Sequence, residues 1–88
     1  MGITEELWDF PVEFTLKTIG HAHEPLADIV TEIVSRHVKG FDASTIELKA
    51  SSKGKYTSVT ARMRFEEKSQ VEGVYRDLND HDAIVWSL

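Results

Sequence analysis

The chain has 88 residues, a formal net charge of −5, a hydrophobic fraction of 41% and no cysteine. This length suits one domain, and the apolar content is sufficient for a packed core and argues against disorder. The absence of cysteine excludes disulfides and thiolate chemistry and is consistent with a reducing cytoplasm, where we expect the protein to act. No apolar run approaches the about 20 residues of a membrane span, and the acidic N-terminal stretch is unlike a signal peptide.

The first half of the chain reads as a lead-in, a strand and a helix. We expect residues 1–9 to be a loosely ordered lead-in, with Leu7 and Trp8 as candidate anchors, and residues 10–88 to form a single domain. Residues 12–19 alternate apolar and polar side chains, which predicts a half-buried strand. The segment GHAHEP (20–25) should end this strand. Apolar residues then recur at helical spacing over 26–37, and Gly40 predicts the end of that helix.

A hairpin is predicted next. Residues 44–51 alternate with Ile46, Leu48 and Ala50 facing inward, and residues 52–55 read as a turn. Residues 56–65 predict the longest strand. Its core-facing row should comprise Thr57, Val59, Ala61, Met63 and Phe65, whereas Arg62 and Arg64 should face water.

The last third of the chain predicts a second helix and a final strand. Ser69 and Glu72 fit a capping box at the start of the helix, and Gly73 inside it favours close packing with a neighbour. Residues 83–88 predict the final strand, with Ile84, Trp86 and Leu88 on one side.

The predicted order is therefore β-α-β-β-α-β. This order is typical of an α+β, ferredoxin-like two-layer sandwich with a four-stranded antiparallel sheet and two helices on one face. The first and third strands should be central in the sheet, and the second and fourth should form its edges.

Four segments of the chain resemble those of a known family. They are LWDFPVEFTLKTIG, SRHVKGFD, SSKGKYTSVT and VEGVYRDLNDHDAIVWSL. They are similar to the YbeD-like family of small bacterial proteins of unknown function, from about Leu7 to Leu88. The resemblance implies a ferredoxin-like fold similar to the ACT regulatory domains of amino-acid metabolism. It implies no catalytic residues, because no activity is established for that family; some members' genes lie near lipoate-attachment functions.

Basic residues gather in the predicted hairpin. Residues 47–64 hold five basic residues and one acidic residue, so this stretch carries 5 − 1 = +4 in a chain of −5. A basic surface attracts anions or acidic partners. The candidate partner or anion surface comprises Lys17, Lys49, Lys53, Lys55, Arg62 and Arg64. A purely structural alternative is that the lysines protect an edge strand from pairing with other chains.

A second hypothesis places a small-molecule effector at the loop between the first strand and the first helix. ACT-like domains typically bind effectors there, at an interface between two copies. The candidate ligand loop comprises Gly20, His21, His23 and Glu24. The two histidines lack the further ligands that a metal site needs, so we predict no metal and no cofactor.

Enzymatic activity and nucleic-acid binding are weaker hypotheses. A phosphate-binding loop of the G-x-x-x-x-G-K-[ST] type is absent, and the serines lack any evident base. An RNA platform on this fold needs aromatic side chains on the open sheet face, where we expect only Tyr56. We therefore predict a non-catalytic interaction or regulatory module that docks an unidentified protein partner or a second copy, with weak nucleic-acid binding as a further alternative.

Overall fold

The structure is a computed structural model that describes residues 9–51 and 53–87. Its elements follow the predicted β-α-β-β-α-β order, with one additional short 3₁₀ helix. They are β1 (Val12–His21), α1 (Leu26–His37), η2 (Ala43–Thr45), β2 (Glu47–Ala50), β3 (Tyr56–Phe65), α2 (Lys68–Asp80) and β4 (Ile84–Ser87). The four strands form one antiparallel sheet in the order β2-β3-β1-β4, which confirms the predicted central and edge strands.

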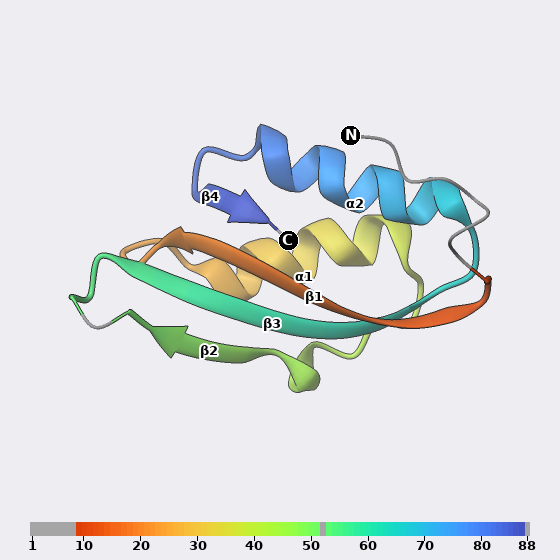
Figure 1. Cartoon of the computed structure of the whole chain (residues 1–88), viewed down its shortest axis with the longest axis horizontal. Helices are drawn as coiled ribbons and strands as arrows, with labels where there is room; N and C mark the ends of the chain where they lie inside the picture. The colour runs from red at the N-terminus through yellow and green to blue at the C-terminus, as the bar shows by residue number, and fades with distance from the viewer. Residues whose placement is uncertain (1–8, 52, 88) are drawn as a thin grey trace.

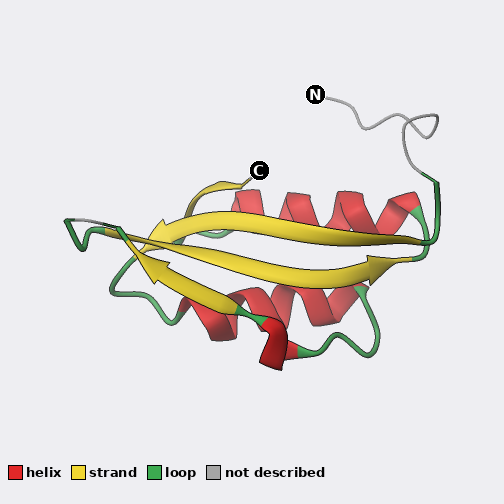
Figure 2. Cartoon of the chain, turned by 60° about the horizontal axis from the view of Figure 1, so that its bottom comes forward, coloured by secondary structure: helices red, strands yellow, loops and turns green. Residues whose placement is uncertain are grey.

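The molecule has two layers. Both long helices lie on one face of the sheet, and no described helix or strand covers the other face, which we call the open face (Figures 1 and 2). The ten residues of β1 pair with the ten residues of β3 from Val12↔Phe65 to His21↔Tyr56. This register determines which side chains share the open face.

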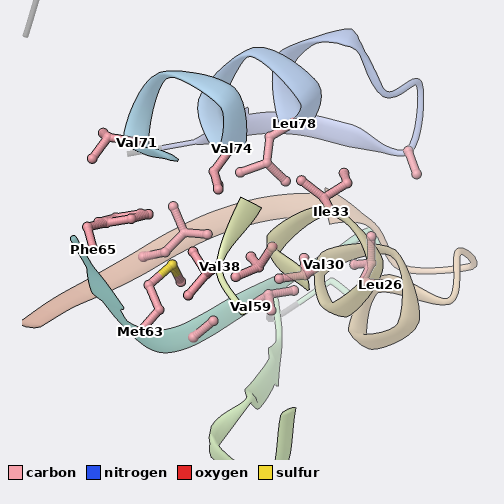
Figure 3. Packing of buried hydrophobic residues seen from close by; sticks show 14 residues of the cluster. Leu26, Val30, Ile33, Val38, Val59, Met63, Phe65, Val71, Val74 and Leu78 are labelled. Carbon is pink, nitrogen blue, oxygen red and sulfur yellow. The ribbon is translucent and has the colours of Figure 1, made fainter. Parts of the chain in front are cut away.

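The core lies between the sheet and the helices (Figure 3). Of the predicted row on β3, Val59, Ala61, Met63 and Phe65 are buried. They meet apolar side chains from α1 and α2, including Val30, Val34, Val71, Val74 and Leu78, each at most 1% exposed. Complete burial of one such side chain contributes roughly 1.5–3 kcal/mol, so these residues are the main source of stability.

The two helices approach each other closely at Gly73. A Cβ atom at this position would lie 2.5 Å from the ring of His37. The missing side chain allows that ring to pack on α2, where Nε2 of His37 lies 2.7 Å from an Asp77 carboxylate oxygen. The predicted role of Gly73 in close packing is therefore confirmed.

Three predictions about element ends and caps were wrong. β1 continues through Gly20 and His21, because these residues still lie opposite Thr57 and Tyr56 of β3. α1 ends at His37, the last residue of the predicted helical spacing, but its C-cap is Val38 and not Gly40, which adopts a positive φ of 77° in the following turn. The capping box of α2 is formed by Glu67 and Gln70, two residues earlier than the predicted Ser69 and Glu72.

The first predicted hairpin strand is shorter and more exposed than expected. Residues 43–45 form η2, and β2 covers only four residues, all of them exposed. Leu48 is on the helix side of the sheet by register, opposite the buried Val59, but its side chain is 55% exposed. Neither long helix makes substantial contact with this edge strand, so the predicted burial of Leu48 and Ala50 was wrong.

The prediction that Ile84 and Trp86 share one side of β4 was also wrong. Trp86 pairs with Ile19 and Ile84 pairs with Gly20, so Val85 is an additional residue in a β-bulge. A bulge shifts the alternation of a strand by one residue. Ile84 therefore lies on the helix side and Trp86 on the open face. The third member of that prediction, Leu88, and the expected anchors Leu7 and Trp8 lie outside the described residues.

Candidate functional site: the open face of the sheet

Rows of paired residues cross the open face. One row runs through all four strands, from Lys49 on β2 through Ser58 and Ile19 to Trp86 on β4. On one side of it lie Tyr56 and His21. On the other side the rows are Glu47–Thr60–Lys17, then Arg62–Thr15, then Arg64–Glu13. Side chains that are opposite each other in an antiparallel pair share a face, so these rows define the surface.

Carboxylates neutralise the arginine end of this face. Arg64 lies 2.9 Å from Glu66 and 3.5 Å from Glu13, and Arg62 lies 3.9 Å from Glu47. Both arginines point to water as predicted, at 61% and 54% side-chain exposure. Exposed pairs of this kind contribute only about 0–1 kcal/mol to stability, but they cancel local charge. The two arginines therefore add little to a basic surface.

The four lysines of the predicted surface lie toward the opposite end of this face. Lys17, Lys49, Lys53 and Lys55 are exposed and form no ion pair with any residue that the structure describes. Lys17 and Lys49 stand on the rows around Ile19, and the other two lie at the hairpin turn. The structure thus divides the six predicted surface residues into a neutralised arginine end and a charged lysine end.

An apolar hollow lies at the lysine end. We call it the aromatic trough; it has a volume of about 420 Å³ and is lined by Ile19, Tyr56, Val85 and Trp86. A second hollow continues from Ile19 and Tyr56 across Ser58 to Lys49 on β2. The Tyr56 side chain is 41% exposed, that of Val85 49% and that of Trp86 50%. Such a concentration of large apolar side chains on an open sheet face is a feature of interaction sites.

Thr18 holds Trp86 in this position. Its side chain is completely buried, and its hydroxyl donates to the Trp86 carbonyl at 3.0 Å and lies 2.6 Å from the Ser87 hydroxyl. These contacts are made on the helix side of the sheet, and they hold the part of β4 that follows the bulge against β1. The indole is consequently directed to the open face, beside Ile19.

Sequence reasoning missed Trp86 and Val85 as site residues. Alternation alone placed Trp86 on the buried side with Ile84. The available signal was Thr18, a polar residue on the otherwise apolar row of β1, which indicates a hydrogen-bonding partner inside the fold.

The predicted ligand loop is closed by its own contacts. A Cβ atom at Gly20 would lie 2.4 Å from Cδ2 of Leu26 and 2.7 Å from the Ala83 carbonyl oxygen, so protein atoms fill the space beside this glycine. The N–H groups of His21 and Ala22 donate to the carbonyls of Ala83 and Lys55, each at 3.0 Å. Internal bonds thus occupy groups that an effector carboxylate would need, and a small-molecule site here stays a prediction that this geometry does not favour.

The two histidines of this loop contact their neighbours. The His21 ring stacks on His23 at 5.7 Å and is tilted against Tyr56 at 5.9 Å. His23 lies 3.5 Å from a Glu24 carboxylate oxygen. Over residues 9–51 and 53–87, no three histidine, cysteine, aspartate or glutamate side chains form a group that could hold a metal ion.

A larger hollow of about 670 Å³ lies at the arginine end of the molecule. Its charged lining mixes both signs. The basic members are Lys39, Arg62 and Arg64 together with His37, and the acidic members are Glu13, Asp42, Glu66 and Glu67. The N-terminus of α2 opens here, where Glu67 and Gln70 form a capping box. Because side chains of both signs are mixed around it, this hollow offers no net field to a ligand.

Comparisons with known proteins agree with the fold. Among the described residues, no helix is long and apolar enough to cross a membrane. A family model described as "Protein of unknown function (DUF493)" matches residues 5–88. The solution structure of protein HP0495 from H. pylori is similar, with a TM-score of 0.74 over 92% of this chain and 85% of that chain. Its sequence is 17% identical, so this likeness concerns the fold alone.

Two relatives are similar in sequence as well. A UPF0250 protein of Shewanella sediminis is 47% identical over 74 residues, which cover 84% of this chain and 82% of the relative. A UPF0250 protein of Paraburkholderia phytofirmans is 32% identical over 83 residues, which cover 94% and 93%. The chain therefore belongs to the DUF493/UPF0250 family, the YbeD-like bacterial proteins of unknown function.

Proposed function

We propose that this protein is a non-catalytic interaction module that binds an acidic protein segment on the open face of its sheet. The observation that carries the proposal is the aromatic trough, in which Tyr56 and Trp86 are 41% and 50% exposed at the charged lysine end of the face. Tyrosine and tryptophan are enriched among the residues that dominate binding energies. Unpaired lysines beside them favour a partner of negative charge.

The trough suits binding better than chemistry. Its lining is apolar, and the histidine next to it, His21, packs its ring against Tyr56 and His23. A bulky apolar side chain of the partner would fill the hollow, while neighbouring carboxylates would approach Lys17 and Lys55. We place this function in the bacterial cytoplasm, in keeping with the cysteine-free composition.

Capture from a native bacterial extract tests the proposal. The bait proteins are the wild type, Trp86→Ala, the double variant Lys17→Glu/Lys55→Glu, and the control Arg62→Glu/Arg64→Glu from the neutralised end of the same face. We expect the first two variants to retain less than about a tenth of the partner, as for the loss of a binding hot spot. The arginine control should retain most of it.

Circular dichroism and thermal melts establish that each bait is folded. Equal capture by all four proteins would contradict the proposal, and so would a loss confined to the arginine variant.

Weak single-stranded nucleic-acid binding is a second candidate, because Trp86 adds a second exposed aromatic residue to the face that carries Tyr56. Bases stack on such side chains when cations are near. In a Trp8→Phe variant, Trp86 is the one remaining tryptophan. Quenching of its fluorescence by an added single-stranded oligonucleotide then reports binding at the trough. Binding of this kind should weaken steeply as salt is raised.

A further inference from the structure

The outer edge of β2 is a second surface with unused binding capacity. Among the described strands, β2 lies along one border of the sheet and pairs with β3 alone (Figure 1). All four of its residues are exposed, and Leu48 has the largest exposed fraction, 55%, among the exposed large hydrophobic residues. An uncovered edge offers free N–H and carbonyl groups to another strand.

The hydrogen bonds to β3 determine which groups are free. The N–H of Ser51 donates to the Tyr56 carbonyl at 2.8 Å, and the Lys49 carbonyl accepts from the Ser58 hydroxyl at 3.3 Å. The direction of these groups alternates along a strand. The odd-numbered residues of β2 therefore direct their backbone groups toward β3, whereas Leu48 and Ala50 direct theirs outward.

Charge selects one register for pairing with an identical strand. When Leu48 lies opposite Leu48 of the partner subunit, antiparallel pairing places Glu47 opposite Lys49 of the partner subunit, and two-fold symmetry repeats this ion pair. Both charged side chains are on the open face, and both leucines are on the helix side.

Other registers lose this match. The outward groups also permit Leu48 opposite the partner's Ala50, but that register places Lys49 opposite the partner's Lys49. Like charges directly opposite each other are destabilising. Centring the pair on Ala50 places Lys49 opposite Ser51 of the partner subunit, and the residue opposite Glu47 then lies beyond the end of β2, in the hairpin turn.

We propose that the protein forms a two-fold symmetric homodimer in which the β2 edges of two copies pair antiparallel, with Leu48 opposite Leu48 of the partner subunit. The two sheets then become one sheet of twice the width. Each leucine covers the other, and each Lys49 faces a carboxylate. The same symmetry brings the hairpin turn that carries Lys53 and Lys55 toward the partner subunit's η2, the short helix before β2. The N-cap residue of η2 is the exposed Asp42.

This dimer goes beyond the proposed function and does not rest on it, because the trough lies on a different part of the sheet. Four-residue strands bury far less than the about 1,600 Å² of a standard interface, so the association is weak and depends on concentration. Sedimentation of the wild type should show monomer at low micromolar and dimer at submillimolar concentration.

Single cysteines test the register, because the natural chain has none. In a hydrogen-bonded antiparallel pair the Cα atoms are about 5.5 Å apart, within the range of a disulfide. Leu48→Cys should therefore form a cross-linked dimer under mild oxidation. Ala50→Cys is the matched control on the same edge, where the two cysteines would be four residues apart, or about 13 Å, and should not cross-link.

A charge exchange tests the ion pairs. Lys49→Glu and Glu47→Lys each place like charges across the edge and should weaken the dimer about tenfold. The double variant Glu47→Lys/Lys49→Glu restores opposite charges and should recover most of the affinity. Circular dichroism verifies that each variant is folded. We expect the fold to tolerate these substitutions, because Glu47 and Lys49 are exposed.

Each result decides the proposal. Monomer at every concentration, equal cross-linking of Ala50→Cys and Leu48→Cys, or a double variant no better than the single variants would overturn it. Leu48 lies outside the aromatic trough, so the dimer can fail while capture through Trp86 persists, and capture can fail while the dimer persists.

Discussion

Asp77 connects the two helices through the His37 ring and also lies 3.6 Å from Arg36. The hydrogen bond from His37 holds the pKa of the Asp77 carboxyl below its usual value, aided by the nearby positive charges of Arg76 and Arg36. The ionised carboxylate therefore stabilises the folded state. Gly73 provides the space that the histidine ring needs to reach it.

Replacement of this carboxylate should cost stability in a pH-dependent way. We expect Asp77→Asn to lower the free energy of unfolding at pH 7 by about 1 kcal/mol, the typical contribution of such a bond. Because the folded pKa is depressed, this contribution is complete above the unfolded value of about 3.9 and is lost as the pH falls through the lower folded pKa. Denaturant titrations at pH 7, 5 and below 3 measure it.

Glu32→Gln is the control, because Glu32 pairs with Arg36 at 3.1 Å with 71% of its side chain exposed. An exposed pair of this spacing contributes about 0.3–0.5 kcal/mol. If the deficit of Asp77→Asn were the same at pH 7 as at the lowest pH, the assigned role of the carboxylate would be wrong.

Individual charges explain part of what the sequence could not predict. The count over residues 47–64 gave a net charge of +4, but Glu13 and Glu66 lie outside that stretch and meet Arg64 only through strand pairing and the following turn. The four lysines form no ion pair with a carboxylate of residues 9–51 or 53–87, although Glu47 lies on the same row as Lys17. Local composition thus located the basic surface, whereas the register determined which part of it stays basic.

At the scale of elements, β3 followed its pattern completely and β4 did not. Ten alternating residues of β3 are long enough to specify both faces, so Tyr56–Phe65 matched residue for residue. β4 has four residues and a bulge at Val85, and an insertion in so short a strand leaves no periodic trace. The trough was therefore not predictable from alternation, although the fold that carries it was.

Thr18 offers a test of how β4 is fixed. We expect Thr18→Val, which keeps the shape but removes the hydroxyl, to lower the free energy of unfolding by about 1 kcal/mol. It should also increase hydrogen exchange in β4 more than in β3, because the lost bond joins β1 to the Trp86 carbonyl. Amide exchange followed by NMR measures both regions together. Uniform acceleration across the sheet would contradict a local role for Thr18.

At the scale of the whole molecule, the two layers have different tasks. The helices cover one face of the sheet (Figure 2) and supply the core. The other face carries the trough and the lysines. The short edge strand β2 leaves a border at which a second copy fits. One sheet can therefore present a partner surface at the trough and an assembly edge at β2.

The central claim is that the open face, and not the helix layer, meets the partner. Photo-cross-linking in living bacteria tests it most directly, with p-benzoylphenylalanine in place of Tyr56 in the trough or in place of Ser35, which is exposed on α1. We predict a discrete protein adduct from position 56 that Lys17→Glu/Lys55→Glu diminishes, and none from position 35. An adduct from position 35 with none from position 56 would contradict the account.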